Sequence, residues 1–141
     1  MERDRHYDVL DHTADLGLII HGRDVRDLFS HAAAALFDTI VDLDTVTVRT
    51  TCTIAVTGDD LTDLFINFLR ELLYLFHGHG FMVKRVDIHA MNETRLEGEA
   101  SGETFDERVH TVHREIKAVT YHMAEATGGA GGWTARVILD V

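Results

Sequence analysis

The sequence predicts an α+β fold in which two helices pack on one face of a mostly antiparallel sheet, as a two-layer sandwich. Both helix-like patterns lie in the first half of the chain, whereas strand-like alternation of apolar and polar residues dominates the second half. The chain has 141 residues, of which 45% are hydrophobic, so it is long enough for one sizeable core. We therefore expect a single domain over residues 1–141.

Two segments carry apolar residues at helical spacing. The first begins after Asp24, a residue type that caps helices, and is expected to end near Val41. The second covers about 60–77, and Asp60 with Asp63 three positions later resembles a capping box. Because the second segment has the wider apolar arc, it is expected to be the central helix of the core.

Seven segments alternate in the manner of strands. They cover about 6–10, 16–21, 46–57, 81–90, 95–101, 116–125 and 133–140. The glycines of 77–80 predict a flexible break, and segment 103–115 is polar and irregular. The loop 127–132 is too rich in glycine to be ordered without contacts.

Composition limits the classes of function. The chain has 13 Lys and Arg against 24 Asp and Glu, a net charge of −11, which argues against a long groove that follows nucleic-acid phosphates and favours cations or basic protein surfaces. Cys52 is the single cysteine, so we expect a buried, inert thiol and neither a disulfide nor a thiolate zinc site. Neither a signal peptide nor a membrane-spanning run is visible, so we expect a cytoplasmic protein with no membrane contact.

A polar cluster near the amino terminus is the first candidate site. Asp11, His12 and Asp15 lie within five residues, between two apolar runs. Carboxylates are hard oxygen donors that suit Ca²⁺, Mg²⁺ or Mn²⁺ better than zinc. The alternative is a turn between two strands, in which Asp11 and Thr13 hydrogen-bond the local backbone.

The end of the chain is the second candidate. A strand that stops at Asp140 and Val141 brings a side-chain carboxylate, a main-chain carbonyl and the terminal carboxylate together, and such oxygens could hold a cation. The alternative is a solvated terminal acid. Lys117 interrupts an apolar strand, and it is either a surface lysine or a contact for a phosphate or a partner's carboxylate.

The histidines form two close pairs, His110 with His113 and His77 with His79. Neither pair has a helical metal-binding pattern or a further set of ligands, so solvated or locally hydrogen-bonded side chains are the preferred interpretation. We find no phosphate-binding loop and no Ser or Cys nucleophile with a matching base. The sequence motifs therefore identify no catalytic residues.

Taken together, these segments resemble the archease family along nearly the whole chain. The matching stretches are Asp11 to Gly17, Ala34 to Asp38, Leu69 to Phe76, Gly102 to Asp106, Glu115 to His122 and Trp133 to Val141. The resemblance implies the archease fold, a two-layer sandwich of helices and strands. It also implies that the protein is not an enzyme but a cofactor of RtcB-type RNA ligases, which use GTP and Mn²⁺ to join RNA ends in tRNA splicing and RNA repair.

In this family the archease promotes guanylation of the ligase histidine and allows the ligase to turn over many times. The resemblance places the metal-binding acids on Asp15 and Asp140, a main-chain oxygen ligand on Val141 and a functional lysine on Lys117. Asp11, where relatives often have Glu, is expected to support the site with His12, and segment 107–114 departs most from the family pattern.

The resemblance also implies that the protein binds a divalent metal ion. Flexible oxygen ligands fit Ca²⁺, whereas the chemistry of the ligase points to Mn²⁺ or Mg²⁺. RNA is expected to be contacted only indirectly, through the ligase. Two other functions stay open at this point: a stand-alone metal-dependent phosphohydrolase, and a chaperone-like binding module.

Overall fold

The computed structural model describes residues 6–11 and 15–141, and of Leu10 and Asp11 the backbone only. Within these residues it contains two α-helices and seven strands, which confirms the predicted α+β class. The strands are β1 (Tyr7–Asp11), β2 (Asp15–Gly22), β3 (Thr50–Thr57), β4 (Phe81–Met91), β5 (Arg95–Thr104), β6 (Ala118–Gly129) and β7 (Gly132–Asp140). The helices are α1 (Val25–Ile40) and α2 (Leu61–His79), with a short 3-10 helix over Leu43–Thr45.

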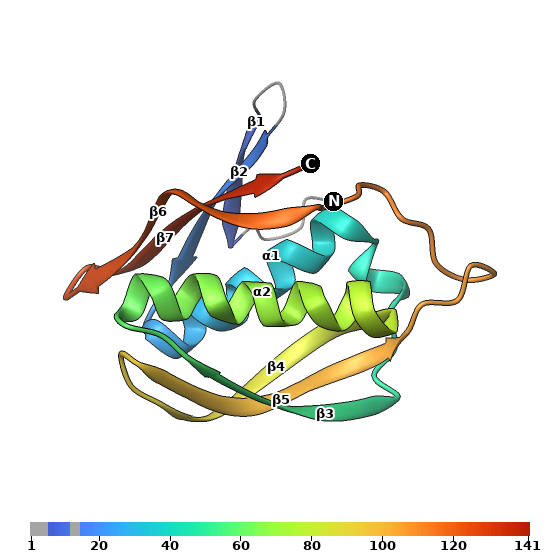
Figure 1. Cartoon of the computed structure of the whole chain (residues 1–141), viewed down its shortest axis with the longest axis horizontal. Coiled ribbons are helices and arrows are strands. Elements are labelled where there is room, and N and C mark those ends of the chain that lie inside the picture. The colour runs from blue at the N-terminus through green and yellow to red at the C-terminus, as the bar shows by residue number, and fades with distance from the viewer. Residues whose placement is uncertain (1–5, 12–14) are drawn as a thin grey trace.

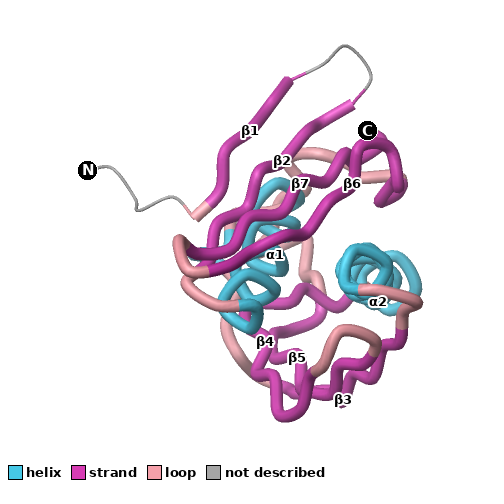
Figure 2. The backbone as a smooth tube through the Cα atoms, turned by 90° about the vertical axis from the view of Figure 1, so that its left-hand side faces the viewer, coloured by secondary structure: helices cyan, strands magenta, loops and turns pink. Residues whose placement is uncertain are grey.

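The strands form two antiparallel sheets, and the helices lie between them (Figures 1 and 2). One sheet has the order β1-β2-β7-β6, and the other has the order β3-β5-β4. The arrangement differs from one sheet with helices on a single face, because α1 contacts both β2 and β4 while α2 contacts both β6 and β3. Because each helix packs against a sheet on two sides, its apolar arc is wide.

The core lies in this middle layer. Phe29 of α1 is fully buried and meets Phe65 of α2 edge to face, at 5.2 Å between ring centroids. Its ring also lies 5.2 Å from that of Phe68. Above them, Leu18 and Ile20 point from β2 toward the helices and are buried as well. In the described part of the chain, neither helix is both long and apolar enough to cross a membrane.

The helix starts follow the predicted capping pattern. The carboxylate of Asp24 accepts a hydrogen bond from the Asp27 main-chain N–H at the start of α1, at 2.8 Å. At the start of α2, Asp60 accepts from the Asp63 N–H at 2.8 Å. The return bond of this second cap differs from a capping box, since the Asp63 carboxylate accepts from the N–H of Asp59, also at 2.8 Å.

The Asp60→Ala variant is expected to lose about 1 kcal/mol of unfolding free energy, since it removes the side-chain acceptor at the start of α2. For a domain of this size the melting temperature should fall by about 2–4 °C. Thermal unfolding followed by circular dichroism checks this. Asp59→Ala is the matched control, because Asp59 takes part in the turn through its main-chain N–H, and an equal loss for both variants would contradict the capping role.

One glycine-rich segment is more ordered than the sequence predicts, and a second is ordered through contacts. Helix α2 continues through His79 and ends at Gly80, whose φ of 65° lies in the left-handed region that suits a glycine cap. The 77–80 segment is therefore helical and not a flexible break. In loop 127–132, strands β6 and β7 stay paired to Gly129 and Gly132, and the ring of Trp133 covers Gly128 so closely that a Cβ there would lie 2.0 Å from it.

Candidate functional site

The two acids expected to bind metal lie directly opposite each other. Strands β2 and β7 pair antiparallel, and their register sets Asp15 opposite Asp140 and Leu16 opposite Leu139. Directly opposed residues of an antiparallel pair extend from the same face of the sheet, with Cβ atoms roughly 4.5–5.5 Å apart. The described ends of β2 and β7 therefore bring both carboxylates to one point, although 124 residues separate them in the chain.

Alternation along the two strands explains this position. Leu16 and Leu139 are buried against the helices, with 2% and 0% of their surface exposed. The neighbouring Asp15 and Asp140 therefore extend from the opposite face, and both are partly exposed. The same apolar pattern that buries the core face sets the register and directs the acids away from the core.

Lys117, the residue before β6, lies at the same end of the sheet. Its main-chain N–H donates a hydrogen bond of 2.7 Å to the Asp140 carbonyl, and Ala118 pairs with Asp140 in the sheet. The lysine side chain is exposed, whereas Val141 is half-buried and packs against the core. Asp15, Lys117, Asp140 and Val141 thus meet at one end of the four-stranded sheet.

Asp11 and His12 are only partly placed. The backbone of Asp11 ends β1, opposite Leu16, which is next to Asp15. The Asp11 side chain and all of His12 lie outside the described residues. Their supporting role stays a prediction from the sequence.

The charges of this site favour a cation. Two like charges directly opposite each other destabilise an antiparallel pair, so a positive ion between Asp15 and Asp140 would relieve the repulsion. Among the side chains that the structure describes, no three His, Cys, Asp or Glu are close enough to hold a metal ion. Asp15 and Asp140 offer two carboxylates, the type of oxygen donor that Ca²⁺, Mg²⁺ and Mn²⁺ prefer.

The histidine pairs do not form metal sites in the described chain. His77 and His79 are exposed at the end of α2, and His113 is exposed too. His110 is different, since it is 2% exposed and hydrogen-bonded to Glu103. The sequence could not reveal this burial, because His110 belongs to a polar segment without periodicity and its partner is on β5.

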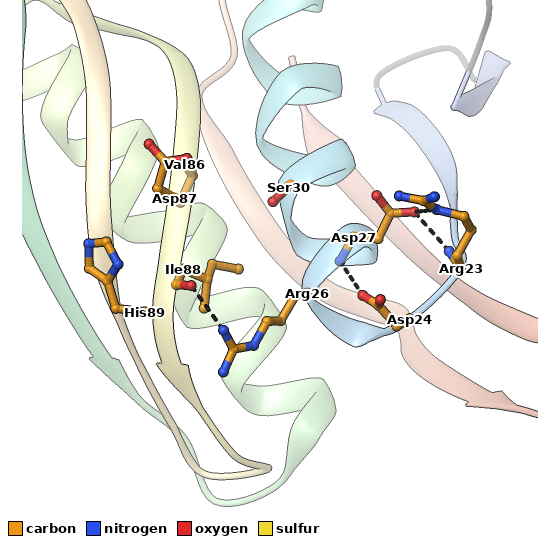
Figure 3. Close-up of a pocket in the computed structure, with 9 residues that line it drawn as sticks. All are labelled: Arg23, Asp24, Arg26, Asp27, Ser30, Val86, Asp87, Ile88 and His89. Carbon is orange, nitrogen blue, oxygen red and sulfur yellow. Dashed lines mark hydrogen bonds and ion pairs between the residues drawn. The ribbon is translucent and has the colours of Figure 1, made fainter.

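A hollow of about 560 Å³ lies elsewhere, between the start of α1 and strand β4 (Figure 3). On its lining, the Arg26 guanidinium donates to the Ile88 carbonyl at 3.1 Å. The Arg23 N–H lowers the pKa of Asp27 through a hydrogen bond of 2.8 Å. None of the predicted site residues lines this hollow. Its Asp87 and His89 pair with Arg85 and Glu99, which lie outside the lining.

Comparison with known proteins identifies the family of the chain. The model of the archease protein family matches residues 7–141. The chain belongs to the archease family. An archease of Methanosarcina mazei is 37% identical over 141 residues, which cover 96% of this chain and 95% of that protein. An archease of Pyrococcus furiosus is 34% identical, covering 97% and 99% of the two chains.

Two solved structures share the fold. Protein 1598 of Methanobacterium thermoautotrophicum has a TM-score of 0.81 and 31% identity, covering 98% of this chain and all of that one. A Thermotoga maritima protein described as an archease and possible chaperone has a TM-score of 0.61. The match covers 100% of this chain and 98% of the Thermotoga maritima chain. At 19% identity it supports only the shared fold.

Proposed function

We propose that this protein activates an RtcB-type RNA ligase in tRNA splicing and RNA repair, promoting guanylation and multiple turnover without being a ligase itself. One observation carries the proposal: in a member of the archease family, Asp15 lies opposite Asp140, and the Lys117 main-chain N–H donates a hydrogen bond to the Asp140 carbonyl. The acidic chain is expected to contact RNA only through the ligase, since its charge of −11 repels phosphates.

In this proposal Asp15 and Asp140 hold a divalent ion, with Val141 contributing an oxygen at the chain end. The ion supplies positive charge that neutralises phosphate or carboxylate groups. The protein's own contribution is to fix the two carboxylates opposite each other on a sheet and to hold the main chain of Lys117 against Asp140. An open pair of ligands allows the partner to complete the coordination.

A stand-alone phosphohydrolase fits the described residues less well. Such an enzyme needs a fixed set of metal ligands with room for an activated water. The side chains described here bring only two carboxylates together at this end of the sheet. The arrangement favours a protein that completes another enzyme's site.

A chaperone-like binding module is the second candidate. The Thermotoga maritima relative is described as a possible chaperone, and Tyr74, Tyr121 and Met123 expose about half of their surface here, at 57%, 48% and 57%. Exposed apolar groups can bind unfolded clients. Suppression of aggregation of several unrelated proteins, with no effect on the ligase, would favour this function.

The Lys117→Ala variant is expected to slow ligase guanylation. A hydrogen bond to a charged group contributes about 1.5–3 kcal/mol, so we expect the stimulated rate to fall by roughly ten- to a hundredfold. Transfer of labelled GMP from GTP to the ligase, with and without this protein, measures the effect.

Arg114→Ala is the matched control, since Arg114 is an exposed cation in the segment that leads to Lys117. It should stimulate like the unaltered protein. If the unaltered protein fails to speed guanylation or to co-purify with the ligase, the proposed function is wrong.

A further inference from the structure

Segment 105–117 connects β5 to β6 without any regular helix or strand and ends at Lys117 (Figure 1). A connection of this length is uncommon, and ordered ones usually have a function. Its first residue, Phe105, donates its N–H to the Gly80 carbonyl at 2.7 Å. Residues 111–115 are all exposed, so the order of the segment must come from a few fixed points.

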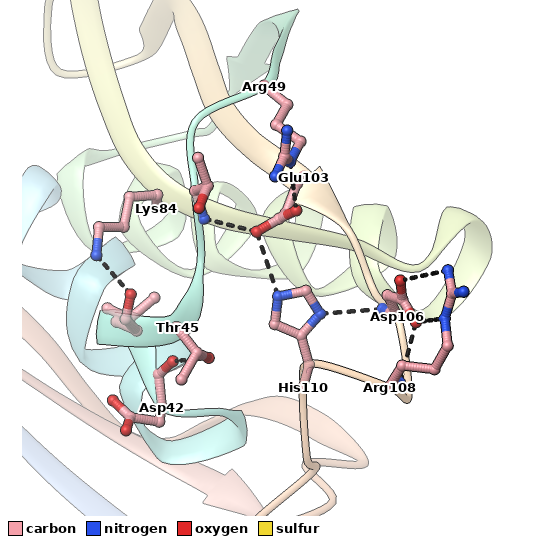
Figure 4. Close-up of polar contacts among 10 residues, drawn as sticks. Asp42, Thr45, Arg49, Lys84, Glu103, Asp106, Arg108 and His110 are labelled. Atoms are coloured by element: carbon pink, nitrogen blue, oxygen red, sulfur yellow. Dashed lines mark hydrogen bonds and ion pairs between the residues drawn. The ribbon is translucent and has the colours of Figure 1, made fainter.

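His110 is the main fixed point (Figure 4). Its ring is buried, and Nε2 lies 3.2 Å from a Glu103 carboxylate oxygen on β5. On the other side, the Asp106 main-chain N–H donates to Nδ1 at 3.0 Å. The imidazole therefore bridges the end of β5 and the first turn of the segment.

These contacts define the tautomer of the ring. Nδ1 accepts a hydrogen bond and carries no proton, so the proton is on Nε2 and is donated to Glu103. Glu103 also accepts from the Thr47 N–H at 2.6 Å, which lowers the pKa of its carboxyl, and from Arg49 at 3.0 Å. Every polar atom of the buried ring is satisfied, and the ring occupies one defined orientation.

The groups around the ring come from three parts of the chain. Glu103 belongs to β5, Arg49 precedes β3, and Asp106 with Arg108 belongs to the segment itself. Arg108 pairs with the Asp106 carboxylate at 3.1 Å, which closes the turn before His110. The ring is thus held by the body of the protein on one side and holds the segment on the other.

From His110 the chain runs to Lys117 along further fixed points. The His113 N–H donates to the Ile40 carbonyl at 2.7 Å, and the Ile116 side chain is 1% exposed. The next residue is Lys117, whose N–H donates to the Asp140 carbonyl at 2.7 Å. The path from the buried ring to the site is short, and it is anchored at each stage.

We propose that His110 is a positioning residue: by anchoring segment 105–117 between Glu103 and the Asp106 N–H, it sets the main chain of Lys117 against Asp140. The role of Lys117 in activation rests on the proposed function, whereas the positioning itself is a property of the isolated protein. His110 acts through Lys117 and does not contact the ligase or its substrate.

The first test uses the isolated protein. Amide hydrogen exchange of the Lys117 N–H should quicken by roughly tenfold or more in His110→Ala, because the bond to Asp140 then opens locally. His110→Gln keeps one donor and one acceptor and should retain most of the protection. His113→Ala is the matched control, since it removes an exposed imidazole and leaves the main-chain bond in place. Unchanged exchange at Lys117 in a folded His110→Ala protein would overturn the proposal.

The second test combines His110→Ala with Lys117→Ala in the guanylation assay. We expect His110→Ala to lower the stimulated rate by roughly ten- to a hundredfold, because Lys117 is then misplaced. In a protein that already carries Lys117→Ala, adding His110→Ala should cause no further loss. Equal losses in both backgrounds would overturn the positioning role. If exchange at Lys117 quickens but even the unaltered protein does not stimulate the ligase, positioning by His110 stands and the proposed function fails.

Discussion

The double variant Asp15→Asn, Asp140→Asn is expected to melt at a higher temperature than the unaltered protein in metal-free buffer, yet to lose its stimulation of the ligase. The two carboxylates lie directly opposite each other on β2 and β7. Opposed like charges cost about 0.2–1 kcal/mol, and the amides remove that cost without changing the shape of the side chains. A gain in stability with a loss of activity distinguishes a functional pair from a structural one.

Adding a divalent metal ion should make the unaltered protein more stable than the double variant. At a concentration of one hundred times the dissociation constant, an ion that binds only the folded state adds about 2.7 kcal/mol, which raises the melting temperature by roughly 5–10 °C. The unaltered protein should show this rise with Ca²⁺ or Mn²⁺, and the double variant should not.

Glu93→Gln is the control for this prediction, because it removes an exposed carboxylate from the turn between β4 and β5, in the other sheet. It should respond to metal like the unaltered protein. An equal rise for the double variant would place the ion elsewhere. No rise in any protein would contradict a metal site formed by the isolated chain.

Phe29→Ala is expected to cause the largest loss of stability. The ring of Phe29 is fully buried between the two sheets and contacts Phe65 and Phe68 of α2. Replacing a buried phenylalanine by alanine costs about 3–5 kcal/mol, through lost burial and the cavity that remains. The melting temperature should fall by about 6–20 °C for a domain of this size.

Denaturant unfolding followed by fluorescence of Trp133 measures this loss. Val9→Ala is the control, because Val9 is 42% exposed on the edge strand β1, and an exposed substitution changes stability by less than about 0.5 kcal/mol. A loss below 1 kcal/mol for Phe29→Ala would contradict a core built in the layer between the sheets.

Local structure follows closely from the sequence. Asp24 and Asp60 cap α1 and α2 as the residue types predict, because capping depends on atoms three residues away. The end of α2 at Gly80 is equally local, although the spacing of glycines suggested an earlier break. The expected strand 46–57 begins only at Thr50, because the preceding residues follow a short 3-10 helix that Asp42 caps.

Long-range pairing does not follow from the sequence in the same way. Alternation predicts strands, but it does not say that β3, β4 and β5 form a sheet of their own on the far side of the helices. The position of Asp15 opposite Asp140 depends on the register of two strands at the two ends of the chain. The family resemblance pointed to both acids, whereas their pairing is visible only in the structure.

Buried polar groups were the hardest feature to predict. Glu103 and His110 are polar residues near an irregular segment, and nothing in their spacing indicates that they leave solvent. Their burial depends on how His110, Thr47 and Arg49, from separate parts of the chain, converge on Glu103 at the end of β5. The same fold brings Lys117 to the site.

Multiple-turnover RNA ligation tests the central claim most directly. The assay uses ligase, GTP, Mn²⁺ and an RNA with a 3′-phosphate and a 5′-hydroxyl end, with this protein present or absent. We predict that the joined product exceeds the amount of ligase many times over with the unaltered protein, and that it stays near one product per ligase with the Asp15→Asn, Asp140→Asn variant. Equal turnover without the protein, or full stimulation by that variant, would contradict the account.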